Sequence, residues 1–347
     1  MLLLRLTWPS PTLCLTRRRA RRSGTSLRQR PSGSNVKGTV SSAPSPHFPY
    51  HVATNDRCRA GGDDGLRAAH AGGPIDGSAS SPTPATEELA KKDFPSFDLT
   101  GKKALVTGAT KGLGRHAATA LAHAGVDVFL SGRDEGELAE CAEEVRAQGR
   151  RVETQATDLT DVNAVVRLGE AAIEAMGRVD VLLNDAGVAL LEPLLGVTVE
   201  RWDAQLNVNL RAPFFLAQTV TQGMIESGRG GKIINIASTA GLIGVPEHAA
   251  YSASKGGLIA LTKTLAVELG SHNAQVNVIC PAIVMTPMGR RLWDHPGVRE
   301  PALEKMPVGR FGKEVDVSAA VIYLASSASD WMNGSQLVVD GGLTAVR

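Results

Sequence analysis

Short runs of apolar and β-branched residues alternate with longer amphipathic stretches from about residue 97 to the end of the chain. This alternation is typical of a parallel sheet that is covered by helices on both faces. It predicts strands over 103–107, 127–131, 151–156, 179–183, 232–237, 275–279 and 336–339, and helices over 113–123, 135–148, 161–176, 199–226, 250–270 and 315–327. We therefore expect one α/β domain over residues 97–346, built on a doubly wound parallel sheet of about seven strands.

The first 92 residues do not show this alternation. No Asp or Glu precedes Asp56, and arginines are frequent among Ser, Thr and Pro near the start. Such a start is typical of an organelle transit peptide, and the Ser-, Pro-, Gly- and Ala-rich stretch over 41–86 is typical of a disordered spacer. We expect residues 1–92 to be a targeting and spacer region for a plastid or mitochondrion; without import the protein would be cytoplasmic. A secretory signal, a basic arm for nucleic acid and a misassigned gene start are the alternatives.

Charge is balanced over the chain, with 37 Lys and Arg against 35 Asp and Glu, so nothing global favours nucleic acid or an acidic partner. The four cysteines include no CxxC pair, and we expect neither a disulfide framework nor a metal site. Apolar runs are interrupted before they reach the roughly 18 residues that a membrane span needs. We expect a small-molecule substrate, and neither nucleic acid nor a membrane as partner.

Three glycines, Gly108, Gly112 and Gly114, lie between the first predicted strand and the first predicted helix. Glycines at such a turn let the backbone approach a pyrophosphate, whose negative charge is favoured at the helix N-terminus. The spacing G-x-x-x-G-x-G differs from the common G-x-G-x-x-G, but its position between strand and helix favours a dinucleotide-binding turn over a purely structural one.

The end of the second predicted strand bears on the choice between NAD and NADP. An acidic residue there would hydrogen-bond the ribose 2′-OH of NAD, whereas a basic residue would accept the 2′-phosphate of NADP. Gly132 stands where the acid is expected, Arg133 follows it, and Lys111 in the glycine turn adds a second cation. This pattern favours NADP(H) over NAD(H). The alternative is that Arg133 is a solvated loop residue and that Asp134 binds the ribose.

Ser238, Tyr251 and Lys255 carry the candidate chemistry. Ser238 follows a predicted strand, and Tyr251 and Lys255 are four residues apart, on one face of a predicted helix. The ammonium can then lie close enough to the phenol to favour its ionised form. A phenol with an ordinary pKa of about 10 becomes usable in this way as a proton donor and acceptor near neutral pH. The three residues together indicate a hydride-transfer enzyme.

These residues and several others, taken in order, resemble the motifs of the short-chain dehydrogenase/reductase family over residues 99–344. The matching positions are Thr107, Gly108, Gly112, Gly114, Asp158, Asn184-Asp185-Ala186-Gly187, Asn209, Ser238, Tyr251, Lys255, Pro281, Thr286 and Asp340-Gly341-Gly342. The resemblance implies a single Rossmann-like domain, a nicotinamide dinucleotide cofactor and a homotetramer.

The resemblance also implies roles for individual residues. Tyr251 would donate the proton to a substrate carbonyl oxygen, and Ser238 would hydrogen-bond the same oxygen. Lys255 would lower the Tyr251 pKa and hold the nicotinamide ribose, and Asn209 would support a water that relays protons to Lys255. Asp158 would contact the adenine, Asn184 would support the cofactor loop, and Thr286 with the Ile283 backbone would fix the carboxamide. The full set of expected cofactor-binding residues is Thr107, Gly108, Lys111, Gly112, Leu113, Gly114, Arg133, Asp158, Asn184, Ala186, Gly187, Tyr251, Lys255, Pro281, Ile283 and Thr286.

Two positions depart from the family pattern. Asp185 stands where the family usually has a second Asn, and Ala282 stands where a Gly usually follows Pro281. The first change adds negative charge near the cofactor loop, and the second restricts the backbone slightly. Neither change removes a catalytic group.

The substrate is expected to be a ketone, diketone or ketose that is interconverted with its alcohol. Residues 188–193, 207–212 and 284–289 resemble dicarbonyl/L-xylulose reductases, and residues 307–312 and 339–344 also occur in tropinone reductase-like members. One alternative is a 3-oxoacyl-acyl-carrier-protein reductase of an organelle, which would need a basic surface at the site mouth, with Arg290 and Arg291 as candidates. Another is a non-enzymatic dinucleotide-binding protein on the same fold. Residues 285–306 are expected to form the substrate lip, as a mobile lid or as a static loop at a subunit contact.

Overall fold

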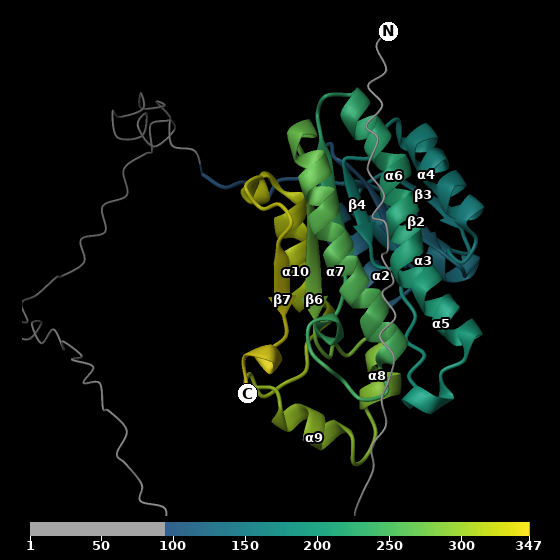
Figure 1. Cartoon of the computed structure of the whole chain (residues 1–347). Helices are drawn as coiled ribbons and strands as arrows, with labels where there is room; N and C mark the ends of the chain where they lie inside the picture. Colours follow the sequence, from purple (N-terminus) through teal and green to yellow (C-terminus); the bar gives the residue numbers. More distant parts are fainter. Residues whose placement is uncertain (1–93, 347) are drawn as a thin grey trace, which may run out of the picture. The chain divides into compact units, whose positions relative to one another are not determined.

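A seven-stranded sheet forms the centre of the protein, in a computed structural model that describes residues 94–346 (Figure 1). All neighbouring strands are parallel, in the order β3-β2-β1-β4-β5-β6-β7. Their bounds are β1 (Lys103–Thr107), β2 (Asp127–Gly132), β3 (Val152–Ala156), β4 (Val181–Asn184), β5 (Gly231–Ile236), β6 (Ala274–Pro281) and β7 (Gln336–Val339). The predicted parallel sheet is confirmed. The targeting and spacer region expected over residues 1–92 lies outside the described residues.

The order of the strands reverses between β1 and β4. From β1 the chain moves outward to β2 and β3, and it then returns to β4 on the other side of β1. Thr107 and Asn184 are register partners at the carboxyl ends of these two strands. In open parallel sheets, ligands bind beyond the carboxyl ends of the strands at such a reversal. The glycine turn after β1 and the loop after β4 therefore meet where a ligand is expected.

Helices cover both faces of the sheet (Figure 1). One core cluster packs α2, α3 and α10 against residues such as Val106 and Leu130, and the other packs α4 and α6 against residues such as Leu105 and Leu182. Neighbouring residues of one strand point to opposite faces, which explains why both clusters share β1. The bounds of the principal helices are α2 (Gly112–His123), α3 (Glu135–Ala147), α4 (Val162–Met176), α6 (Ala212–Glu226), α7 (Ala249–Leu269) and α10 (Glu314–Ala325).

The helix predicted over residues 199–226 is not regular along its length. It is divided into α5 (Val199–Leu206), a π-helical turn η2 (Asn207–Arg211), and α6. A single π-turn inside a helix is frequent at functional sites, and apolar periodicity does not reveal it. Two further helices, α8 (Pro287–Trp293) and α9 (Arg299–Glu304), lie in the segment expected to form the substrate lip. All other predicted strands and helices agree with the structure to within two residues at each end.

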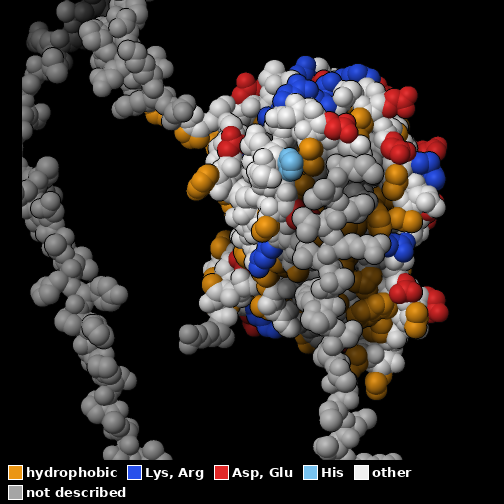
Figure 2. Space-filling model, turned by 45° about the horizontal axis from the view of Figure 1, so that its top comes forward, with side chains coloured by type: hydrophobic (Ala, Val, Ile, Leu, Met, Phe, Trp, Pro, Cys, Tyr) orange, Lys and Arg blue, Asp and Glu red, His pale blue; other side chains and the backbone are white. Residues whose placement is uncertain are grey.

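Basic side chains stand at the amino ends of several strands, on the edge of the sheet opposite to the carboxyl ends. Figure 2 shows Lys and Arg side chains gathered in its upper part, with Asp and Glu side chains beside them. Arg178 pairs with Asp180 at 2.8 Å, and Lys232 pairs with Asp330 at 2.6 Å. These two basic side chains are therefore paired with carboxylates. Within residues 94–346, no helix is both long enough and apolar enough to cross a membrane.

Candidate active site

A cleft of about 1250 Å³ opens at the carboxyl edge of the sheet. Small-ligand pockets occupy roughly 300–1,000 Å³, so this cleft has room for a dinucleotide and a small substrate together. The predicted site residues that line it are Gly108, Lys111, Gly112, Leu113, Arg133, Asp158, Ala186, Gly187, Ser238, Tyr251, Lys255, Pro281, Ile283 and Thr286. The other predicted site residues, Thr107, Gly114, Asn184 and Asn209, are not part of the lining.

The glycine turn closes tightly against the loop that follows β4. A Cβ on Gly114 would lie 2.4 Å from the carbonyl oxygen of Gly108, and a Cβ on Gly108 would lie 2.9 Å from the Cα of Ala186. Gly108 and Gly112 have φ values of +73° and +63°, which L side chains rarely adopt. The turn therefore needs glycine at these positions, and it brings the backbone N–H groups at the start of α2 to the cleft.

Thr107 and Asn184 do not line the cleft but hold its framework together, Thr107 by binding the loop after β4 and Asn184 by joining β4 to β5. The Thr107 Oγ1 accepts hydrogen bonds from the backbone N–H groups of Asp185 and Ala186, each at 3.2 Å. The Asn184 Nδ2 donates to the Asn235 Oδ1 at 2.9 Å, which ties β4 to β5. These two residues fix the loop after β4, and the loop itself lines the cleft.

At the end of β2, a side chain on Gly132 would have to displace the Thr110 methyl group. A Cβ on Gly132 would lie 2.4 Å from the Cγ2 of Thr110. Asp134, the alternative ribose acceptor, caps α3 instead, because its Oδ1 accepts a hydrogen bond from the Glu137 backbone at 2.9 Å. Arg133 lines the cleft. Asp134 does not line the cleft.

Lys111 and Asp158 complete this end of the cleft. The Lys111 Nζ forms an ion pair with the Glu137 carboxylate at 2.8 Å, so its charge is partly neutralised. The Asp158 Oδ1 accepts a hydrogen bond from the Thr160 backbone at 2.9 Å. Hydrogen bonds from Thr160, and secondarily the charge of Arg133, lower the pKa of Asp158. The carboxylate is therefore ionised at neutral pH.

Ser238, Tyr251 and Lys255 meet at the cleft from two elements. Ser238 follows β5, and its Oγ accepts a hydrogen bond from the Ala240 backbone at 3.1 Å. Tyr251 lies in the first turn of α7, and Lys255 lies one turn later. The Lys255 Nζ is 5.8 Å from the centre of the Tyr251 ring and donates to the backbone oxygen of Ile236 at 2.8 Å. The ammonium is thus anchored to β5 beside the phenol.

Burial dominates the electrostatics of these groups. It raises the pKa of Tyr251 to about 12; a hydrogen bond with Ser238 opposes the rise and the charge of Asp185 adds to it. Burial also lowers the pKa of Lys255 to about 8, against the opposing effect of Asp185. Tyr251 is therefore protonated at neutral pH, as a proton donor must be. The predicted lowering of the Tyr251 pKa by Lys255 is wrong for the free protein, because burial raises this pKa instead.

Asn209 occupies the π-turn and is fully buried. Its amide pairs with both backbone groups of Val188, accepting from the N–H at 2.8 Å and donating to the oxygen at 2.9 Å. Its Nδ2 also donates to the Ser254 Oγ at 3.0 Å, and that hydroxyl donates to the backbone oxygen of Tyr251 at 2.7 Å. Asn209 therefore joins the loop after β4 to the start of α7. Ser254 was not predicted, and its only signal in the sequence is its place beside Lys255.

The substrate end of the cleft contains Arg291, which was a candidate, and side chains that the sequence analysis did not select. His248 and Trp293 line it, and the His248 ring lies 6.0 Å from the Tyr251 ring and 6.4 Å from the Trp293 ring, between centroids. Arg291 and Lys305 also line it. Arg290 was expected beside Arg291 at the mouth, but it donates to the Met285 backbone and is not part of the lining. Trp293, Arg291 and Lys305 come from the lip, where no periodic pattern guides a prediction, and His248 immediately precedes α7.

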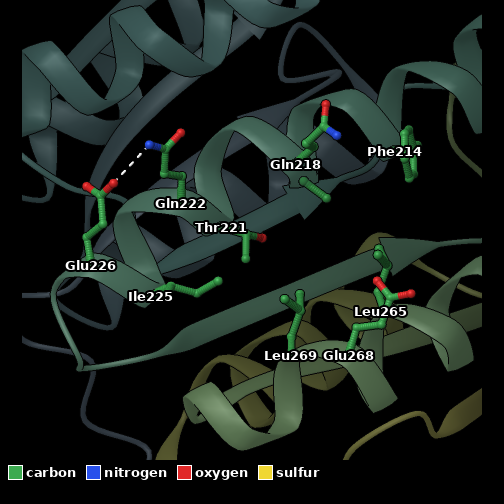
Figure 3. A pocket seen from close by; sticks show the side chains of 10 residues that line it. Phe214, Gln218, Thr221, Gln222, Ile225, Glu226, Leu265, Glu268 and Leu269 are labelled. Atoms are coloured by element: carbon green, nitrogen blue, oxygen red, sulfur yellow. Dashed lines mark hydrogen bonds between the residues drawn. The ribbon is translucent and has the colours of Figure 1, made fainter. Parts of the chain in front are cut away.

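A second hollow, of about 400 Å³, lies between α6 and α7 (Figure 3). Leucine, isoleucine and phenylalanine side chains line it together with Gln, Thr and Glu, and Figure 3 shows the Gln222 amide hydrogen-bonded to Glu226. The three catalytic candidates do not line this hollow. Within the described part of the chain, no group of three or more His, Cys, Asp or Glu side chains is arranged to hold a metal ion.

Comparisons with known proteins identify relatives of the chain. Residues 108–344 match the family model described as Enoyl-(Acyl carrier protein) reductase. The L-xylulose reductase of Mesocricetus auratus is 42% identical over 244 residues, which cover 70% of this chain and 97% of that protein.

Solved structures of similar proteins share the fold. A short-chain type dehydrogenase/reductase from Mycobacterium marinum is 33% identical with a TM-score of 0.69, and the match covers 72% of this chain and 98% of that one. A gluconate 5-dehydrogenase from Burkholderia cenocepacia J2315, in complex with NADP and tartrate, is 34% identical with a TM-score of 0.69 and the same coverage of 72% and 98%. Because the matches span nearly the whole of these enzymes, the chain belongs to the short-chain dehydrogenase/reductase family and is an oxidoreductase that acts on CH–OH groups with a nicotinamide dinucleotide.

Proposed function

We propose that the protein is an NADPH-dependent reductase that converts a small ketone, diketone or ketose into its alcohol. One observation carries the proposal: the cleft that contains Ser238, Tyr251 and Lys255 also contains Arg133, beside a strand that ends in Gly132 instead of an acidic residue. Tyr251, the proton donor, follows β5 in the chain, and Arg133, the cation, follows β2. These two strands lie on opposite sides of the reversal between β1 and β4. The cleft thus offers a cation for a 2′-phosphate and a proton donor for a carbonyl.

The glycine turn fits a dinucleotide because it has no side chain where the backbone approaches the loop after β4. Gly108, Gly112 and the start of α2 would hold the diphosphate. Thr286 and the Ile283 backbone would hold the nicotinamide carboxamide, and Arg133 would hold the 2′-phosphate of NADP. When bound, the nicotinamide supplies a hydride to the carbonyl carbon.

The residues of this chain then manage the proton. Tyr251 holds its proton at neutral pH and gives it to the carbonyl oxygen, so the carbon gains the hydride and the oxygen gains the proton. The Ser238 hydroxyl donates a hydrogen bond to the same oxygen as negative charge develops there. Lys255, held by the Ile236 oxygen, keeps a positive charge near the phenolate that forms. Asn209 holds the loop after β4 and the start of α7 in register during the reaction.

The substrate end also favours a second candidate, a keto acid. Arg291 and Lys305 line the cleft, and neither forms an ion pair with another residue of the described region. A neutral ketose needs no cation, whereas a sugar acid or the phosphopantetheine of an acyl carrier protein would use one. The matched relatives include a reductase of the ketose L-xylulose and a gluconate dehydrogenase, so both classes occur among proteins similar to this chain.

The experiment is the oxidation of NADPH, with NADH in parallel, by the purified protein. The panel contains a diketone, a neutral ketose, a sugar keto acid, a cyclic ketone and a 3-oxoacyl thioester. We expect NADPH-specific turnover of the diketone or ketose. A preference for the keto acid that Arg291→Ser abolishes would replace the leading substrate class with the second. A preference for the thioester would support the carrier-protein reductase, and absence of turnover with all five would contradict the proposal.

We further propose that the protein assembles as a homotetramer through the face that carries α6 and α7. Figure 2 shows hydrophobic side chains gathered in a band on this side of the molecule. Val267 on α7 is 84% exposed, Trp202 on α5 is 40% exposed, and Ile225, which lines the hollow of Figure 3, is 38% exposed. A second copy of the chain would cover such a face. Sedimentation of Val267→Glu should show smaller particles than wild type, whereas Ala139→Glu on α3 should sediment like wild type; unchanged sedimentation of both would contradict the proposal.

We also propose that residues 1–92 direct import into an organelle. The support is their composition, which is free of acidic residues before Asp56 and rich in Arg and Ser. A fluorescent protein fused to residues 1–92 should accumulate in plastids or mitochondria, and cytoplasmic fluorescence would contradict the proposal. A chain that starts at Lys91 should fold and keep full turnover. Loss of turnover would show that the first segment contributes to the folded enzyme.

A further inference from the structure

Asp185 carries a carboxyl group into the glycine turn. It follows β4, and its backbone N–H is held by the Thr107 hydroxyl at 3.2 Å. A Cβ on Gly114 would lie 2.7 Å from the Asp185 Oδ2, and a Cβ on Gly108 would lie 3.1 Å from the same oxygen. The side chain therefore points from the loop after β4 toward the turn that would hold the diphosphate.

The surroundings of this carboxyl suit a neutral group. The Gly114 backbone N–H acts on it as a hydrogen-bond donor and lowers its pKa. The carbonyl oxygen of Gly108 would lie 2.4 Å from the same added Cβ on Gly114, so a hydrogen-bond acceptor also faces the space beside Gly114. An Asn amide or a protonated carboxyl can accept from one group and donate to the other, whereas a carboxylate can only accept.

The charged groups that act on Asp185 come from α7. Lys255 favours the ionised form, and the Gly114 hydrogen bond does so more weakly, but burial outweighs both and raises the pKa of Asp185 to about 7. The carboxylate in turn opposes the loss of the Lys255 proton and raises the pKa of Tyr251. Burial therefore favours the protonated form of Asp185, and Lys255 favours the ionised form.

A bound dinucleotide changes this balance. Its diphosphate is negative and would lie at the start of α2, beside the Asp185 carboxyl. Two like charges at one site disfavour each other, so a diphosphate favours the protonated carboxyl and an ionised carboxyl weakens the binding of a diphosphate.

We propose that Asp185 links cofactor binding to a proton: the protein takes up a proton at this carboxyl when it binds the dinucleotide, and its affinity falls as the pH rises above neutral. The inference rests on the proposed function, because it assumes that the glycine turn holds the diphosphate. No bond is made or broken; one proton moves from solvent to the Asp185 carboxylate. Asp185 is a positioning residue, because it acts on the turn and on Lys255 rather than on the reacting carbonyl.

The test is the NADPH dissociation constant of wild type and Asp185→Asn between pH 6.5 and 9, measured by the fluorescence of the bound cofactor. The ratio of wild type to variant cancels the titration of the 2′-phosphate. This ratio should rise by up to about tenfold for each pH unit above 7, because the variant carries no proton to lose. Asp158→Asn is the matched control, since that carboxyl also lines the cleft and is ionised throughout; it should keep the wild-type slope.

A second measurement reports on the proton itself. The infrared difference spectrum on adding NADPH at pH 8 should contain the band of a protonated carboxyl in wild type and in Asp158→Asn, and should lack it in Asp185→Asn. A ratio of dissociation constants that does not change with pH, together with no such band, would overturn this inference while leaving the proposed function intact. Absence of NADPH binding to wild type at every pH would instead overturn the proposed function, and this inference with it.

Discussion

Replacing Gly114 with Ala tests whether the close packing of the glycine turn is needed for diphosphate binding. The added methyl group would lie 2.4 Å from the Gly108 oxygen and 2.7 Å from the Asp185 Oδ2. Both distances are shorter than a carbon and an oxygen tolerate, and the first involves backbone, which cannot rotate away as a side chain can. The turn must therefore open by several tenths of an ångström.

The size of the effect follows from this overlap. Inserting a methyl group into packed surroundings costs about 1–3 kcal/mol. If this strain raises the free energy of the cofactor-bound turn, the affinity for NADPH falls by roughly 5- to 150-fold, since about 1.4 kcal/mol corresponds to a factor of ten. The melting temperature should fall as well, because Gly108 and Asp185 belong to the loops that join β1 and β4 to their neighbours.

The assay is a fluorescence titration of NADPH with wild type, Gly114→Ala and the matched control Gly223→Ala. Gly223 lies within α6, and a Cβ there would meet no heavy atom within 4 Å. The control should bind NADPH as wild type does and should gain up to about 1 kcal/mol of stability from better helix propensity. Affinity of Gly114→Ala within twofold of wild type would refute the reasoning, because the turn would then have space that the structure does not contain.

Arg133→Ser should lower the affinity for NADPH roughly 10- to 150-fold, because a lost charged hydrogen bond costs about 1.5–3 kcal/mol. The affinity for NADH should stay within twofold of wild type. Equal losses of affinity for both cofactors would show that Arg133 does not bind the 2′-phosphate. Asn235→Leu should lower the free energy of unfolding in urea by about 1–3 kcal/mol, because it leaves the buried Asn184 amide without its acceptor, and an unchanged midpoint would contradict this. Burial raises the Asp185 pKa from 3.8 to about 7, so wild type loses stability over this pH window, as the folded state holds the proton more tightly than the unfolded chain. The melting temperature of Asp185→Asn minus that of wild type should therefore increase between pH 3.8 and about 7 and then level off. If this difference does not vary with pH, the raised pKa is contradicted.

The parallel sheet and the catalytic motif could be predicted from the sequence because each leaves a local signal. The buried strands are continuous apolar runs, and Tyr251 and Lys255 are separated by one helical turn. The glycine turn is likewise local, since its strand and helix stand on either side of Gly108 and Gly114.

Other features depend on contacts between distant segments, which a single sequence does not reveal. The π-turn at Asn209 is stabilised by Val188 and Ser254, which are 21 and 45 residues away. The position of Lys255 depends on the Ile236 oxygen, and the raised pKa of Asp185 depends on burial by the glycine turn. The lip helices α8 and α9 are short and interrupted by Pro and Gly, so they have no clear period. Their cleft-lining cations were only partly foreseen, since Arg291 was a candidate and Lys305 was not.

The most direct test of the central claim is the comparison of wild type, Tyr251→Phe and Tyr323→Phe in NADPH binding and in turnover of the best carbonyl substrate. Tyr323 lies on α10 beside Phe97 and is outside the cleft lining, which makes it a matched control. Tyr251→Phe should bind NADPH as wild type does and lose roughly 10²- to 10⁴-fold in kcat, because only the proton donor is removed, while Tyr323→Phe should retain full turnover. Turnover by Tyr251→Phe close to that of wild type would contradict the account, since the proton would then come from another group.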